Sequence, residues 1–194
     1  LLAPETAEKL AALINPNAVI QDVTAITETV HKDTVYITVV DKDRMSVSLI
    51  YSIFNTFGSG ISSDKFGILM HNRGAGFNLI PGHPNELRGG YRPMHTIIPG
   101  MLRKDGKPVM PFGVMGGQYQ ANGHARVLTN MLDYGMAPQP ALDAPRSFAE
   151  LGHLKVERSY DPKEVQKLVD IGHQIKQDIK PIGGAQAIMM HENG

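Results

Sequence analysis

The chain has 194 residues, of which 42% are hydrophobic and 20% charged, a composition typical of one globular unit. Nineteen basic and nineteen acidic side chains leave no net charge and form no basic cluster, which argues against a nucleic-acid-binding surface. The absence of cysteine excludes disulfides, thiolate catalysis and Cys-ligated zinc. It leaves the compartment undecided, with the periplasm or cytoplasm of a bacterium as the expected alternatives.

Both ends read as cuts in a longer chain. Leu1 is not methionine, so we expect the native start to lie upstream. The last residues, 189–194, stop just after an apolar run, so we expect a truncated C-terminus as well. Apolar runs are short and interrupted by Pro or Gly, and we therefore expect no membrane span in this segment.

The first half of the chain changes from a helical to a strand pattern. Residues 4–14 carry apolar side chains at helical spacing, and residues 17–33 are a polar connector. The β-branched run 34–40 and the run 45–51, separated by a polar turn, predict a β-hairpin. Residues 67–70 read as a further short strand.

A long segment rich in Gly and Pro, residues 73–93, interrupts this pattern, and such long loops in a compact domain are usually functional. Two strands, 96–103 and 109–113, follow with a turn at 104–107. Helical patterns are then expected at 121–134 and, briefly, at 140–145.

The pattern Asp161–Pro162–Lys163–Glu164 predicts the start of a helix, with Asp as N-cap, Pro at the first position and Glu at the third. This helix should reach about Gly172, and a Gly183–Gly184 turn leads into a last strand at 185–190. Strands, then helices, then a strand indicate an α+β layered domain.

Residue types alone leave several sites open. Eight histidines suggest a metal, yet none has metal-ligand spacing, so hydrogen-bonded or solvated histidines are the better interpretation and no metal site is expected. Gly116–Gly117, after an apolar strand and before a helix, fits a phosphate-binding turn only weakly, because the dinucleotide and P-loop fingerprints are absent.

The stretch Asp33–Asp41, DTVYITVVD, is more specific. It resembles the segment of the γ-glutamyltranspeptidase (glutathione hydrolase) family in which the precursor cuts itself before a Thr that begins the small subunit. Further segments match in family order: Phe57–Gly60, Gly67–Leu69, Pro81–Asn85, Arg92–Pro93, Gly113–Gly117, Ala141–Arg146 and Gly183–Ala187. The resemblance implies that residues 1–33 are the tail of the large subunit with the cleavage linker, that 34–194 are the small-subunit region, and that most of the large subunit is missing.

The resemblance makes Thr34 the nucleophile and Asp33–Thr34 the cleavage site. Cleavage before Thr34 would free an α-amine with a pKa of about 8, close enough to neutral to act as the base that a Thr hydroxyl needs. The maturation step would use the same hydroxyl in an N-to-O acyl shift. By position alone, Thr34 would merely open a strand, and the surrounding motifs decide for the nucleophile.

Other site residues are implied in the same way. Gly116 and Gly117 match the paired glycines whose N–H groups form the oxyanion hole, where a Cβ would block close approach of the substrate. Ser52 matches a hydroxyl residue that hydrogen-bonds the nucleophile's new amine. His95 and Thr96 match a Ser–Ser pair that binds the glutamyl α-carboxylate, and Thr96 keeps the hydroxyl.

Three departures from the typical family bear on the substrate. Phe54 stands in place of an Asn beside the nucleophile, and Arg73 and Gly76 stand where typical members hold the substrate's α-ammonium. An Arg repels an ammonium and prefers a carboxylate or phosphate; a surface or inter-subunit salt bridge is the alternative for Arg73. The loop Leu79–Arg92 is also shorter than the family's lid-bearing loop, which suggests a water-accessible site.

These departures resemble the divergent, cephalosporin-acylase-like branch of the family. They favour hydrolysis over transfer, and an acyl group with a terminal carboxylate and no ammonium, such as glutaryl, over γ-glutamyl. The implied fold is the four-layer αββα sandwich of N-terminal nucleophile hydrolases, here partial. The implied partners are a small γ-glutamyl or other acyl amide, of the glutathione or glutaryl type, and the large-subunit region of the same precursor, and the mechanism needs no cofactor.

Two rival hypotheses stay open. In one, the protein never matures and acts as a non-catalytic binding homologue, which Phe54 and Arg73 keep plausible. In the other, it is an acyl-transfer enzyme on the same scaffold that releases or anchors poly-γ-glutamate.

Overall fold

Two units make up the computed structural model, which describes residues 4–19, 33–178 and 180–192. One unit contains residues 28–144 with 182–194, and the other contains 1–27 with 145–181. Most of the predicted connector 17–33 lies outside the described residues. Within the described ranges, no helix has the length and apolar character needed to cross a membrane.

The larger unit opens with the predicted hairpin. Strands β1 (Asp33–Val40) and β2 (Ser46–Phe54) pair antiparallel, as their β-branched residues favour. The turn between them is held by the Asp41 carboxylate, which accepts hydrogen bonds from the N–H groups of Asp43 and Met45 at 2.9 and 2.8 Å. The hairpin is therefore fixed by local chemistry at its closed end.

A second sheet has the order β3-β4-β8, formed by β3 (Pro99–Lys104), β4 (Lys107–Met115) and β8 (Gly184–Ala187). All neighbours are antiparallel. Asp105 and Gly106 join β3 to β4 with φ angles of 51° and 76°, the left-handed pair that a two-residue hairpin turn requires. The turn predicted at 104–107 is thus confirmed.

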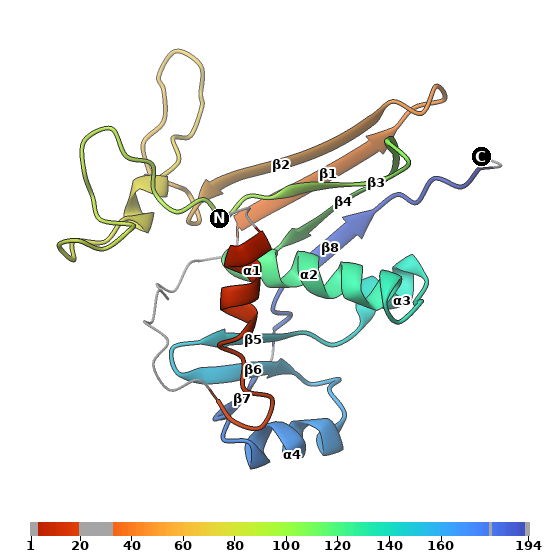
Figure 1. Cartoon of the computed structure of the whole chain (residues 1–194). Coiled ribbons are helices and arrows are strands. Elements are labelled where there is room, and N and C mark those ends of the chain that lie inside the picture. The colour runs from red at the N-terminus through yellow and green to blue at the C-terminus, as the bar shows by residue number, and fades with distance from the viewer. Residues whose placement is uncertain (1–3, 20–32, 179, 193–194) are drawn as a thin grey trace. The chain divides into compact units, whose positions relative to one another are not determined.

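The two sheets pack face to face, with helix α2 (Tyr119–Leu132) on the other side of the second sheet (Figure 1). Tyr36 of β1 is 2% exposed, and its ring lies directly over Gly113 of β4. On the opposite face, Val114 packs against Gly123 of α2. The short helix α3 (Pro138–Asp143) follows α2. Hairpin, sheet and helix are three successive layers of an αββα sandwich.

The outer face of the hairpin is apolar and uncovered by other described residues. Its side chains are between 43% and 62% exposed, and they are Val35, Ile37, Val39, Val47, Leu49 and Tyr51. Six apolar side chains on one face of two paired strands form the kind of patch that marks a contact surface.

The smaller unit contains α1 (Pro4–Ala11), α4 (Pro162–Asp170) and a sheet of β5 (Ser147–Glu150), β6 (His153–Glu157) and β7 (Ile175–Asp178). β5 and β6 are antiparallel, and β6 and β7 are parallel. The predicted start of α4 is confirmed, because the Asp161 carboxylate accepts the Lys163 N–H at 2.8 Å.

Several sequence-based boundaries were wrong. The helix expected at 4–14 ends at Ala11. Residues 67–70 form no strand, because only Leu69 makes an isolated bridge, with Ser62. Strands β5, β6 and β7 were missed, because strands of four or five residues carry too short a pattern. The strand expected from residue 96 begins only at Pro99, because side chains of α2 take the backbone groups before it.

We expect Gly113→Ala to destabilise the protein by about 1–3 kcal/mol. A Cβ at this position would lie 2.3 Å from Cδ2 and 2.4 Å from Cε2 of Tyr36, so the two sheets would have to separate. Urea unfolding of the full-length protein measures the change. Gly89→Ala is the matched control, because a Cβ there meets nothing within 4 Å. Equal stability of the two variants would contradict the packing described.

Candidate active site

The open end of the hairpin carries Thr34 and Ser52 as direct cross-strand neighbours. The register shifts beside them, since Asp33 pairs with Phe54 and Ile53 is an extra residue on β2. Phe54 has a φ of 79°, which is unusual for a residue with a side chain. Its N–H donates to the Ser52 hydroxyl at 3.1 Å. Bulges and strained residues of this kind gather at functional sites.

A glycine turn follows β4 and leads into α2. Gly116 and Gly117 have φ angles of 140° and 60°, and their carbonyls accept the N–H groups of Tyr119 and Gln120 at 3.2 Å. A Cβ on Gly116 would lie 3.0 Å from the Ile182 carbonyl oxygen. Within the described part of the chain, neither glycine N–H donates to a loop or side-chain acceptor. The turn thus has two N–H groups to offer a ligand.

The direction of the strands brings the Thr34–Ser52 end and the glycine turn to the same edge of the packed sheets. Near the hairpin's closed end, Ser46 contacts Met190, whose N–H bonds Val109 at the start of β4. Further along, the Ser48 hydroxyl reaches the Phe112 carbonyl at 3.4 Å. β2 therefore runs in the direction of β4, and the ends of both strands lie at one edge.

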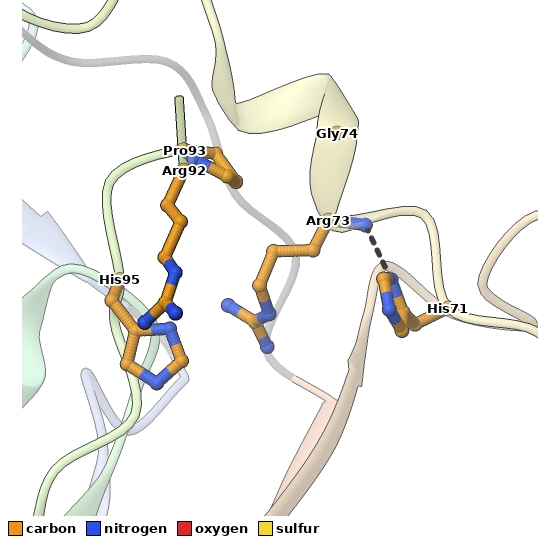
Figure 2. A pocket seen from close by; sticks show the side chains of 6 residues that line it. All are labelled: His71, Arg73, Gly74, Arg92, Pro93 and His95. Carbon is orange, nitrogen blue, oxygen red and sulfur yellow. Dashed lines mark hydrogen bonds between the residues drawn. The ribbon is translucent and has the colours of Figure 1, made fainter. Parts of the chain in front are cut away.

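A basic pocket of about 570 Å³ is formed by residues of the segment that connects β2 to β3. Among the described residues its lining includes no Asp or Glu, and the lining residues are His71, Arg73, Gly74, Arg92, Pro93 and His95. Figure 2 shows the side chains of Arg73 and Arg92 extending into the same space, with His95 beside Arg92. Two cations facing one space without an intervening carboxylate repel each other unless an anion lies between them.

Arg73 is the buried member of this pocket. It begins the short helix η1 (Arg73–Gly76) and is 8% exposed. Its Nη1 donates to the Thr96 hydroxyl at 3.1 Å, and its Cζ lies 5.0 Å from the centre of the Phe54 ring. Its Nη2 is buried and has no partner among the described residues. Burial lowers the pKa of Arg73, although an Arg stays protonated in proteins.

The predicted site residues therefore form three groups. Phe54, Arg73, His95 and Thr96 belong to the pocket region, Thr34 and Ser52 to the hairpin end, and Gly116 and Gly117 to the turn. Phe54 links the first two groups, because its ring supports Arg73 while its N–H bonds Ser52. Together they offer a hydroxyl, paired backbone donors and a cationic pocket, a set of groups that suits acyl transfer.

Arg92 and His71 also line the pocket, and sequence reasoning assigned neither a role. Arg92–Pro93 is one of the segments that resemble the family. A second Arg in the same Gly- and Pro-rich segment as Arg73 could have indicated that Arg92 also belongs to the site. His71 holds the start of η1, since its Nδ1 accepts the Arg73 N–H at 3.1 Å. Among residues that the structure describes, no three His, Asp or Glu side chains gather as metal ligands.

Known relatives are similar over most of this chain. It is 40% identical over 174 residues to the glutathione hydrolase-like YwrD proenzyme of Bacillus subtilis, covering 85% of this chain and 33% of that protein. It is 35% identical over 173 residues to the oxamate amidohydrolase proenzyme of Klebsiella pneumoniae, covering 84% and 32%. The chain thus spans about a third of the length of these relatives.

Solved structures give the same result. Cephalosporin acylase from Bacillus halodurans superposes with a TM-score of 0.84 at 37% identity, covering 99% of this chain and 35% of that one. An acivicin-inhibited γ-glutamyltranspeptidase gives 0.71 at 26% identity, covering 79% and 88%. These likenesses confirm the predicted N-terminal nucleophile hydrolase fold. Since the γ-glutamyltranspeptidase family model also matches residues 1–194, the chain belongs to the γ-glutamyltranspeptidase family.

Proposed function

We propose that this chain carries the nucleophile of a self-cleaving amidohydrolase, with Thr34 as the nucleophile and Asp33–Thr34 as the bond that is cut. Cleavage would divide the chain into residues 1–33 and the small-subunit region 34–194. The observation that carries the proposal is the convergence of the Thr34–Ser52 pair and the Gly116–Gly117 turn at one edge of the packed sheets.

Self-cleavage would begin with attack of the Thr34 hydroxyl oxygen on the Asp33 carbonyl carbon. The C–N bond breaks, the acyl group moves to oxygen, and the Thr34 nitrogen becomes a free amine. Water then hydrolyses the ester. The irregular register beside Thr34 and the strained Phe54 support this step, because a distorted strand end exposes its peptide bond to attack.

Turnover of an amide would use the same atoms. The hydroxyl attacks the substrate carbonyl carbon, its proton passes to the Thr34 amine, and the oxyanion is held by the N–H groups of Gly116 and Gly117. The ammonium then protonates the leaving amine as the C–N bond breaks. Water hydrolyses the acyl ester with the same amine as base. Ser52, paired with Thr34, would orient the amine.

The acyl group is proposed to end in a carboxylate and to lack an ammonium. Nη2 of Arg73 is buried with no partner among the described residues, and Arg92 lines the same pocket, so a carboxylate would satisfy one donor and relieve the repulsion. Thr96 would orient Arg73 or share the carboxylate, and His95 would close the pocket rim. The ammonium of a γ-glutamyl group would instead meet two cations. Among the relatives, one is named an oxamate amidohydrolase, and oxamate carries a carboxylate and no ammonium.

Hydrolysis is favoured over transfer to an acceptor amine because the loop 79–92 leaves the pocket open. Leu79 is 81% and Tyr91 57% exposed, so neither packs against the rest of the described chain as a closed lid would. Water reaches such a site at a concentration that acceptor amines cannot match.

The large-subunit region of the same precursor is the proposed partner. The related proenzymes are about three times as long as this chain. The apolar outer face of the β1–β2 hairpin is the surface it would cover, since side chains such as Ile37 and Leu49 are otherwise left in water.

We expect the full-length wild-type protein to split into two fragments, with Thr34 as the new N-terminus, and Thr34→Ala to stay intact. The variant should also lose at least about 10³-fold in amide turnover, because the attacking oxygen is gone. Intact-mass measurement after long incubation tests both proteins. Thr38→Ala, four residues along β1, is the matched control and should split. If wild type stays intact, the unprocessed binding homologue becomes the better hypothesis.

We expect Arg73→Met to lower kcat/KM for glutaryl-anilide about 10- to 100-fold, because the charged hydrogen bond to the carboxylate is lost while the side chain can still pack on Phe54. Butyryl-anilide, which has no carboxylate, should be cleaved at an unchanged rate. Arg103→Met, at an exposed position of β3, is the control. Faster hydrolysis of γ-glutamyl-anilide than of glutaryl-anilide by wild type would overturn the proposed acyl preference.

A further inference from the structure

The hydrogen-bonded ladder between β3 and β4 ends at the pair Pro99 and Gly113, close to the glycine turn. Pro99 pairs with Gly113, so the next pair in register would be Ile98 with Val114. These two residues do not pair. The Ile98 N–H donates to Oε1 of Gln120 at 3.2 Å, and the Val114 N–H donates to Nε2 of His124 at 3.3 Å. We call this point, formed by Ile98 and Val114, the strand fork.

Two side chains of α2 therefore replace the ladder at the strand fork. Gln120 and His124 are four residues apart, so they lie on the same face of the helix, toward the sheet. The His124 ring packs against Phe112 with centroids 4.9 Å apart. A hydrogen bond with the Ile98 backbone opposes the lowering of the His124 pKa that burial causes. The Val114 contact requires an unprotonated Nε2.

The two arms of the strand fork lead to different parts of the site. Ile98 lies two residues after Thr96, which receives the hydrogen bond from Arg73. Val114 lies two residues before Gly116, the first glycine of the turn. The strand fork is thus where the segment that carries Thr96 joins the sheet, and it lies one residue before the end of β4, which the glycine turn follows.

Burying the Gln120 side chain costs free energy, because part of its amide group gives up water without gaining a hydrogen bond. It is 0% exposed, and its Nε2 is buried without a partner among the described residues. Such half-satisfied amides are unusual in a core and point to a role other than stability.

We infer that Gln120 and His124 are positioning residues at the strand fork: Gln120, which contacts only the Ile98 arm, fixes the Thr96–Arg73 carboxylate subsite, and His124, which contacts both arms, chiefly fixes the Gly116–Gly117 turn. This inference rests on the proposed function. Gln120 acts on KM for a carboxylate-bearing acyl group, and His124 acts on kcat for any acyl group.

The test is a comparison of Gln120→Met and His124→Leu in the full-length protein. Gln120→Met should raise KM for glutaryl-anilide about 5- to 10-fold, through loss of one positioning hydrogen bond, and leave butyryl-anilide hydrolysis within about 2-fold. His124→Leu should lower kcat for both substrates about 10-fold or more, and, because His124 also bonds the Ile98 backbone, it should raise KM for glutaryl-anilide no more than Gln120→Met does. Gln120→Glu keeps an acceptor for the Ile98 N–H, so its KM for glutaryl-anilide should lie close to the wild-type value.

The controls are Gln166→Met and His153→Leu, which change the same residue types at exposed positions. Urea midpoints accompany the kinetics. If both variants change kcat and KM together, in proportion to lost stability, the pair is only structural and the inference is wrong. Wild-type KM in Gln120→Met, or unchanged kcat in His124→Leu, overturns it as well.

Glutarate binding to the uncleaved Thr34→Ala protein, measured by calorimetry, separates this inference from the proposed function. Weaker glutarate binding in Gln120→Met supports the positioning role even where wild type neither cleaves itself nor hydrolyses an anilide. Equal binding with and without Gln120→Met, or no binding by either, overturns the role of Gln120 whatever the catalytic outcome.

Discussion

The packing of Tyr36 on Gly113 is the contact on which the rest of the site depends. The aromatic ring occupies the space that any side chain on Gly113 would fill, so the hairpin lies close against the second sheet. The Tyr36 hydroxyl bonds Ser48 at 2.7 Å, and Ser48 reaches the Phe112 carbonyl. This one cluster fixes both the spacing and the direction of the two sheets, and hence the edge at which Thr34 and Gly116 lie.

A buried guanidinium is the second constraint. Removing Arg73 from water costs free energy that one hydrogen bond to Thr96 and the Phe54 ring only partly offset. Nη2 of Arg73 has no partner among the described residues, and Arg92 adds a second positive charge to the same pocket. An anionic ligand therefore gains more here than at an exposed Arg, because part of the desolvation has already been met by folding.

The sequence was most informative where chemistry is local. The Asp161 cap, the Asp105–Gly106 turn and the β-branched hairpin depend on neighbours in the chain, and each was predicted. Thr34 and the paired glycines were identified by family resemblance rather than by periodicity. The late start of β3 was not predictable, because it depends on Gln120, whose side chain comes from a helix more than twenty residues away. The Arg73–Thr96 contact is nonlocal in the same way.

Phe54 and Arg73 are best understood as one change from the typical family pattern. A phenylalanine at position 54 removes a polar group beside the nucleophile, and its ring then supplies the surface on which the Arg73 guanidinium rests. The same residue keeps its backbone N–H on Ser52, so one side of Phe54 contacts the hairpin end and the other the cationic pocket. Restoring a polar side chain at position 54 alone would leave a buried cation with less support. The position of the Arg73 guanidinium and the geometry around Thr34 are therefore coupled through a single aromatic residue.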